Sequence, residues 1–145
     1  MTKNTIIILL TTILLLVAAA VIGYYFFNKG PVNIEKSKGI EATSNELYTS
    51  YTKDPEGARK KYDGKVIKVT GLISDILENT QKQQVILLKT SNPGGNINCT
   101  MEVSDANFKQ GNIAIIKGVC HGLGQGDPDV GILGDVYVTR SVISN

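Results

Sequence analysis

The chain has few of the side chains from which metal sites and catalytic centres are usually built. Its 145 residues include two cysteines, Cys99 and Cys120, and one histidine, His121. A structural zinc site usually takes four Cys or His ligands, so we expect no metal site. Cys120 and His121 are adjacent, and adjacent strand residues point to opposite faces, which argues against a thiol–imidazole pair. No serine lies in a nucleophile-elbow pattern, so we expect no catalytic residue and no cofactor.

A strong charge of either sign is also missing. The chain has 15 Lys and Arg against 13 Asp and Glu, a formal net charge of +2. This balance provides no strong field for nucleic acid or anionic lipid. Aromatic residues are scarce as well: beyond residue 27 they are Tyr48, Tyr51, Tyr62, Phe108 and Tyr137.

One long apolar run stands at the N-terminus. Residues 5–27 contain no charge and no proline, and a helix of this length spans about 34 Å, enough to cross a hydrocarbon core of about 30 Å. The aromatic residues 24–27 would lie at the far interface. We expect residues 1–27 to form an uncleaved, single-pass membrane anchor with the rest of the chain exported. The alternative is a signal sequence cleaved after Ala20, which would leave a secreted or periplasmic protein.

The remainder is long enough for one small domain and a linker. Residues 28–42 are rich in Gly, Pro, Ser and charge, which predicts a linker, and residues 43–145 are predicted to form the domain. Thr43 and Glu46 have the spacing of a capping box, and Asp54–Pro55 is typical of a second helix start. Three tyrosines at helical spacing are expected in the core: Tyr48, Tyr51 and Tyr62.

After residue 64 the apolar period changes to two, which indicates strands. The first is long and has Gly71 in its middle, which predicts a sharp bend. Four more strands are predicted at 84–90, 96–103, 113–121 and 135–143. Five strands favour a mainly β, five-stranded OB-fold Greek-key barrel preceded by two short α-helices and the transmembrane helix. An open sandwich fits less well because it usually has about seven strands.

Several segments resemble the tRNA_anti-like OB-fold family over roughly residues 47–145. They are 51–71, with Gly64-Lys65-Val66-Ile67-Lys68-Val69-Thr70-Gly71 at its end, then Ile97-Asn98-Cys99-Thr100-Met101, 111–122 and Gly134-Asp135-Val136. The resemblance implies an OB fold in a small bacterial protein behind a signal or membrane segment, and therefore a place at the bacterial cell membrane. The general function of this family is not established.

The most unusual loop is Gly122–Gly134. Its Gly-x-Gly-x-Gly run is no phosphate cradle, because neither Gly-Lys-Ser/Thr nor a helix follows. Its aspartates imitate the start of a calcium loop but lack the later glutamate, so weak cation binding ranks below a flexible hairpin loop. In OB folds this loop flanks the ligand groove. We therefore expect ligand contacts at Gly124, Gln125, Asp127 and Asp129.

A disulfide between Cys99 and Cys120 is left open by the sequence. An exported domain can keep such a bond, and alternation places both thiols on inward faces. Their strands are separated by a third strand in an OB barrel, which puts the strand axes about 10 Å apart. A disulfide needs Cα atoms within about 7 Å.

The residues of the second and third barrel strands bear on function. In OB folds these strands stack bases on aromatic side chains, but here they hold no aromatic residue and one lysine, Lys89. Nucleic acid is therefore not the expected partner. Our leading hypothesis is a non-enzymatic, exported and membrane-tethered OB-fold module that binds a protein, peptide or glycan. The alternative is a domain that binds single-stranded, tRNA-like nucleic acid, and a small hydrolase or metal-dependent enzyme comes third.

Overall fold

The structure, a computed structural model, describes residues 2–28, 30 and 32–144, which divide into two compact units, 1–32 and 33–145. The first unit is the helix α1 (Lys3–Phe27) of 25 residues, none of them buried. Its mean hydropathy reaches 3.0, and it is long and apolar enough to cross a membrane. At 1.5 Å per residue it measures about 37 Å.

Two short helices open the second unit. Helix α2 (Ser44–Lys53) begins with the predicted capping box: the Glu46 amide donates to Thr43 Oγ1 at 3.2 Å, and the Thr43 amide donates to the Glu46 carboxylate at 2.8 Å. Helix α3 (Pro55–Tyr62) begins where Asp54 Oδ1 accepts from the Gly57 amide at 3.1 Å. Both predicted helix starts are confirmed, because each side chain bonds an amide that has no partner within the helix.

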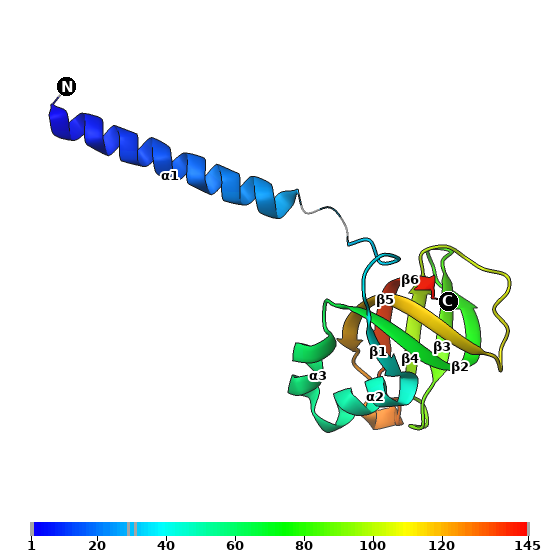
Figure 1. The fold of residues 1–145 in the computed structure, drawn as a ribbon. Helices are drawn as coiled ribbons and strands as arrows, with labels where there is room; N and C mark the ends of the chain where they lie inside the picture. The colour runs from blue at the N-terminus through cyan, green and yellow to red at the C-terminus, as the bar shows by residue number, and fades with distance from the viewer. Residues whose placement is uncertain (1, 29, 31, 145) are drawn as a thin grey trace. The chain divides into compact units, whose positions relative to one another are not determined.

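Five strands close into a barrel, as Figure 1 shows. They are β2 (Val66–Glu78), β3 (Gln84–Lys89), β4 (Asn96–Met101), β5 (Ile113–Leu123) and β6 (Val136–Ile143). They follow the order β2-β3-β4-β6-β5, and a β2–β5 pairing completes the circle. The β4–β6 pair is parallel and the others are antiparallel. This is the predicted OB-type barrel.

Gly71 marks the point where β2 changes partner. The strand pairs with β5 as far as Leu72 and with β3 from Ile73 onward. A Cβ atom on Gly71 would lie 2.9 Å from Ser44 Oγ and 3.1 Å from Leu88 Cβ. Helix α2 and β3 therefore pack directly against the strand backbone at a residue without a side chain, while the register shift of β2 lies further on, between Ile73 and Asp75.

A sixth strand, β1 (Ile40–Thr43), lies within and just beyond the range expected to be a linker. It pairs with β2 in parallel, with Ile40 opposite Ile67. The preceding segment is also held: Ile34 is buried, and Lys117 Nζ donates to the carbonyl oxygens of Glu35 and Ser37 at 3.2 and 2.9 Å. The sequence did not predict that residues 34–43 pack against the barrel, because their isolated apolar residues show no period and their partners lie on strands that are distant in the sequence.

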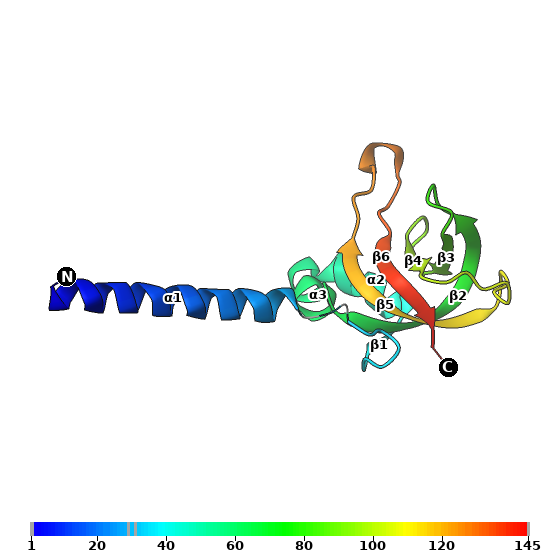
Figure 2. The same ribbon diagram turned by 90° about the horizontal axis from the view of Figure 1, so that it is seen from above.

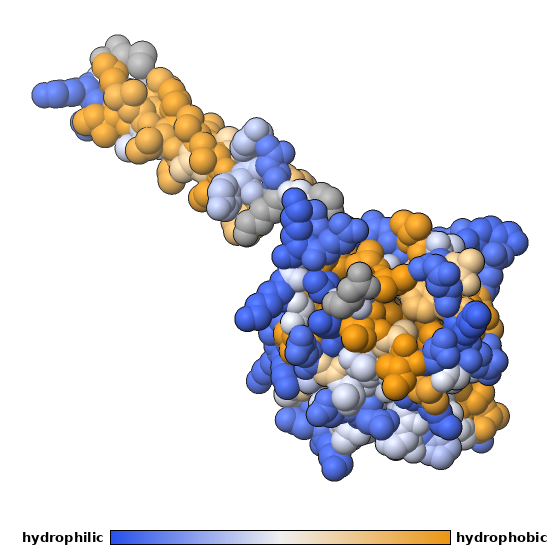
Figure 3. Space-filling model, turned by 45° about the vertical axis from the view of Figure 1, so that its right-hand side comes forward, coloured by the Kyte–Doolittle hydropathy of each residue, from blue (hydrophilic) through white to orange (hydrophobic). Residues whose placement is uncertain are grey.

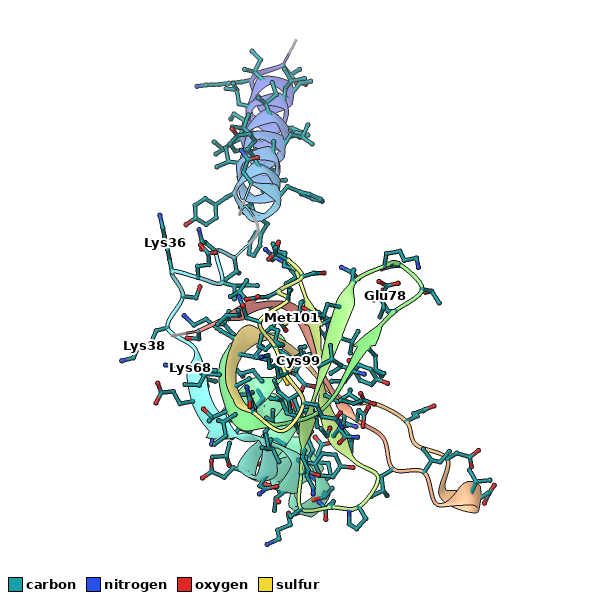
Figure 4. All side chains as sticks on the ribbon, turned by 90° about the vertical axis from the view of Figure 1, so that its right-hand side faces the viewer. Lys36, Lys38, Lys68, Glu78, Cys99 and Met101 are labelled. Atoms are coloured by element: carbon teal, nitrogen blue, oxygen red, sulfur yellow. The ribbon has the colours of Figure 1, made fainter. Side chains whose placement is uncertain are left out.

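The core fills the barrel with inward-facing residues of all five strands. Figure 4 shows Cys99 and Met101 in the barrel interior. The tyrosines of α2 and α3 join this core, as predicted; the largest fully buried side chains include Tyr48, Tyr51, Leu47, Ile67, Ile73, Ile86, Leu88, Ile97 and Ile116.

Candidate binding face

The loop predicted to contact a ligand is a hydrogen-bonded hairpin, residues 124–135, which extends β5 and β6 beyond the barrel (Figure 2). Backbone hydrogen bonds join its two arms. The Gly124 amide donates to the Asp135 carbonyl at 2.8 Å, and the Asp127 and Ile132 residues form an isolated bridge with bonds of 2.8 and 2.9 Å. We call this segment the β5–β6 hairpin.

Glycines allow the two arms of the hairpin to lie close together. A Cβ atom on Gly126 would lie 2.6 Å from the Gly134 nitrogen, and one on Gly134 would lie 2.8 Å from the Gly124 carbonyl carbon. Real Cβ atoms do not approach backbone so closely, so these two positions require glycine. The glycine-rich run therefore shapes the hairpin.

The hairpin tip is a short 3-10 turn, Pro128–Val130, capped by Asp127. Asp127 Oδ1 accepts from the Asp129 amide at 3.2 Å, the local bond that makes aspartate a frequent turn residue. Groups of three or more Cys, His, Asp or Glu residues that could hold a metal ion are absent from the described part of the chain.

Helix α2 bonds one stem of the hairpin and lies beside the strand that leads into the other. Tyr48 Oη donates to the Gly134 carbonyl at 2.8 Å. Tyr51 Oη donates to the Asp63 carboxylate. This carboxylate lies close to Gly122: a Cβ atom on Gly122 would be 2.9 Å from Asp63 Oδ1. Gly122 has a φ of +88°. Burial, followed by the bond to Asp63, raises the pKa of Tyr51, so this phenol stays protonated and serves as a donor. The two buried tyrosines thus position a hairpin that they do not cover.

The outer surface of β3, β4 and β6 continues from the hairpin base. Leu87, Asn98 and Tyr137 lie side by side on it, since Leu87 pairs with Asn98 and Asn98 with Tyr137. Tyr137 is 42% exposed, and its ring lies where a Cβ on Gly124 would project. Tyr137 therefore packs against a predicted contact residue and presents an exposed aromatic ring beside the hairpin.

The four predicted contact residues lie together in this region. Gln125, Asp127 and Asp129 are exposed, and Gly124 is half-buried against Tyr137. Sequence reasoning did not assign Tyr137 or the exposed apolar residues of the hairpin, Val130, Ile132 and Leu133. The alternation Val136-Tyr137-Val138 would have indicated that Tyr137 is exposed, because the two valines on either side of it are buried and neighbouring strand residues point to opposite faces.

The two cysteines are free thiols, buried on either side of Val138 in the sheet. Cys99 on β4 and Cys120 on β5 both pair with this residue, so one strand separates them. Burial raises the pKa of Cys99 and of Cys120, although the Tyr51 hydroxyl, 3.3 Å from Cys120 Sγ, acts in the opposite direction. Burial and the raised pKa therefore both disfavour the reactive thiolate at neutral pH. His121 points to the exposed side, as predicted.

The solved structures include two with a similar chain path. A lipoprotein of Klebsiella pneumoniae, described as a candidate nucleic acid-binding protein, is 18% identical with a TM-score of 0.47 and covers 72% of this chain and 92% of its own. A candidate aspartyl-tRNA synthetase of Leishmania major is 10% identical with a TM-score of 0.42; the match covers 79% of this chain and 22% of the synthetase chain. With TM-scores below 0.5, neither assigns a ligand here.

A search of the curated proteins finds no match. A family model described as tRNA_anti-like matches residues 1–130, most of the chain, including all of the barrel except β6 and the end of the hairpin. The closed barrel described above agrees with this match. The chain belongs to the tRNA_anti-like family.

Proposed function

We propose that this protein is a non-enzymatic, exported binding module that α1 tethers to the bacterial cell membrane. Its OB barrel binds a protein, peptide or glycan partner through the β5–β6 hairpin and the adjoining surface around Tyr137. Residues Gly124, Gln125, Asp127 and Asp129 contribute to this contact as part of the hairpin.

The proposal rests on the exposed apolar residues of the hairpin. Its apolar residues are held outward, with Val130 65% and Ile132 58% exposed, on a stem that α2 and paired backbone fix in place. An apolar projection whose arms are already hydrogen-bonded supplies contact area at a lower cost in ordering the loop. Exposed apolar residues that cluster on a soluble domain are typical of interaction sites.

The charge of the hairpin argues against a phosphate backbone as ligand. Between Lys117 and Arg140 the chain has no lysine or arginine, whereas it has Asp127, Asp129 and Asp135. Binding to single-stranded nucleic acid relies on basic side chains along the backbone and on several stacked aromatic rings. The alternative partner is a single-stranded, tRNA-like nucleic acid.

A photo-crosslinking residue placed at Ile132 in the full chain tests the proposal in cells. A matched variant carries the same residue at Glu56, which is exposed on α3. We expect a discrete adduct from position 132 and none from position 56. Adducts at neither position, or equally at both, contradict a contact at the hairpin.

Fluorescent oligonucleotides distinguish the alternative partner. We expect no binding at micromolar concentration and physiological salt. Micromolar binding that weakens steeply with added salt would make nucleic acid the partner, because such a slope reports counterions released from phosphates.

A further inference from the structure

A second apolar surface lies outside the hairpin, on the outer side of β2 and β5 and at the C-terminal end of β6. We call it the lateral face and define it by Leu72, Ile113, Ile115 and Ile143. Ile113 is 73%, Ile143 44% and Leu72 40% exposed. Leu72 pairs directly with Ile113 across β2 and β5, and Ile113, Ile115 and Ile143 line one hollow of about 340 Å³. Figure 3 shows hydrophobic residues gathered on this side of the second unit.

The charged residues around the lateral face are mostly lysines. The hollow at Ile143 has Lys109 as its one charged residue among the described lining, and a neighbouring hollow lined by Leu72 and Ile113 has Lys89. Neither of these two linings contains a carboxylate among the described residues, whereas a third hollow, lined by Ile115 and Lys68, includes Glu41 and Glu46. The first two linings contrast with the β5–β6 hairpin, whose apolar residues lie among aspartates.

More lysines lie at the other end of the same surface. Figure 4 shows Lys36, Lys38 and Lys68 together on one side of the barrel, away from Glu78. Lys68 pairs with Glu41 at 3.6 Å, so part of its charge is offset there. Exposed apolar side chains bordered by lysine ammonium groups match an anionic lipid interface, which offers acyl chains below negatively charged headgroups.

If α1 spans a membrane, the short segment after it keeps the second unit near the lipid surface. Five residues, 28–32, separate the end of α1 from the second unit, and five residues reach at most about 17 Å. A contact too weak to hold a free protein at a membrane becomes populated when the partner surface stays at a high effective concentration.

We propose that the lateral face docks on the surface of an anionic bilayer, with Ile113 entering the interface and Lys89 and Lys109 contacting lipid headgroups. The proposal rests on the membrane tether of the proposed function. It leaves the β5–β6 hairpin available to a partner in the aqueous phase, since that segment carries aspartates that an anionic surface repels.

The absence of tryptophan from the chain provides the test. Ile113→Trp and Val130→Trp each introduce a single tryptophan at sites of similar exposure, one on the lateral face and one on the hairpin. The full-length variants are placed in nanodiscs whose phosphatidylglycerol has brominated acyl chains. We expect a blue-shifted emission and at least a twofold quenching at position 113, and neither at position 130.

The charge dependence gives a second readout. Quenching at position 113 is expected to fall at least twofold in Lys89→Glu/Lys109→Glu, in 1 M salt and in zwitterionic discs. Three results would each overturn the proposal: water-like emission at position 113, equal quenching at both positions, or burial of the tryptophan of Ile113→Trp in lipid-free detergent as protein concentration rises. The last would mean that a second copy covers the face.

Failure of the tether gives a different result from failure of docking. A chain that does not co-elute with the discs refutes the anchor. In that case the free variants mixed with brominated anionic vesicles still decide the docking, since the emission of Ile113→Trp reports lipid contact with or without an inserted α1.

Discussion

Tyr48 and Tyr51 are neighbours on one face of α2, yet their hydroxyl groups hold different parts of the molecule. Tyr48 binds the carbonyl of Gly134 in one stem of the hairpin, and Tyr51 binds Asp63 and lies beside Cys120. The spacing in the sequence placed both rings in the core. It did not give their hydrogen-bond partners, because these lie 86 and 12 residues away.

Tyr48→Phe keeps the ring and removes the hydrogen bond to Gly134. We expect the free energy of unfolding to fall by about 1 kcal/mol, the usual contribution of a single neutral hydrogen bond. Urea denaturation measures the loss, and hydrogen exchange at the Gly124 amide should quicken as the stem loosens. In the control Tyr137→Phe, at an exposed ring, stability should change by less than about 0.5 kcal/mol; equal losses in both variants would contradict the anchoring role.

The thiols allow a direct chemical measurement. We expect Cys99 and Cys120 to resist alkylation in the native protein at pH 8, because burial shields both sulfurs and raises the pKa of both. Denatured without reductant, the protein should take up two alkyl groups by intact mass. A product with no added groups would instead demonstrate a disulfide between the two residues.

The buried groups Cys99 and Tyr51 should make the free energy of unfolding depend on pH in the alkaline range. Burial raises the pKa of Cys99 and Tyr51, so the folded protein keeps protons that the unfolded chain releases above its ordinary thiol pKa of about 8.5. The unfolded state then binds fewer protons, and the free energy of unfolding falls as pH rises. Urea titrations at pH 7, 9 and 10.5 should show this decline, with a shallower slope in Tyr51→Phe; stability that rises over this range would refute it.

At the scale of elements, β5 and β6 pack closely at Gly118, which has no side chain. A Cβ atom on Gly118 would lie 2.7 Å from Ser141 Oγ, 2.7 Å from Val138 Cγ1 and 2.8 Å from the Thr139 carbonyl oxygen. The pairing of the two strands is irregular here, and Arg140 has a φ of +51°. The backbone of β6 therefore bulges into the space that a side chain at residue 118 would need.

Gly118→Ala should force β5 and β6 apart. We expect a loss of about 1–3 kcal/mol in stability, as in overpacked cores. Thermal denaturation followed by far-UV circular dichroism measures it. Gly23→Ala is a matched substitution in α1 with no atom within 4 Å of the new Cβ, and it should leave the melting of the barrel unchanged. An unchanged melting temperature in Gly118→Ala would show that β6 can shift freely.

The length of an element decided whether the sequence revealed it. Alternation identified the five barrel strands, which run from 6 to 13 residues. The four residues of β1 are too few for a period, and their partners in β2 lie 27 residues later in the chain. The order of the hairpin likewise depends on close approaches between glycines of opposite arms, which a glycine-rich sequence does not distinguish from a flexible loop.

At the scale of the molecule, the sequence divides into an apolar helix and a barrel with its own core. Every buried residue among those described lies in the second unit, from Ile34 onward. This division was predictable because one segment is continuously apolar and the rest alternates. The ligand was not, since the exposed side chains that would choose it come from several strands whose order the sequence alone does not fix.

The proposed membrane tether makes a prediction for the whole chain. We expect the full-length protein to remain in the membrane pellet after carbonate washing and to enter solution with detergent, because a helix of about 37 Å spans the hydrocarbon core. Intact mass should include residues 1–27. A soluble product that begins at Val21 would show that the leader is a cleaved signal sequence.

The clamp between Lys117 and the carbonyls of Glu35 and Ser37 has a mechanical consequence. Tension applied through the N-terminal tether first loads this clamp and the buried Ile34, and next the short strand β1. The five barrel strands close on one another without β1. We therefore expect the segment from Asn33 to Thr43 to lengthen under load before the barrel and its hairpin unfold.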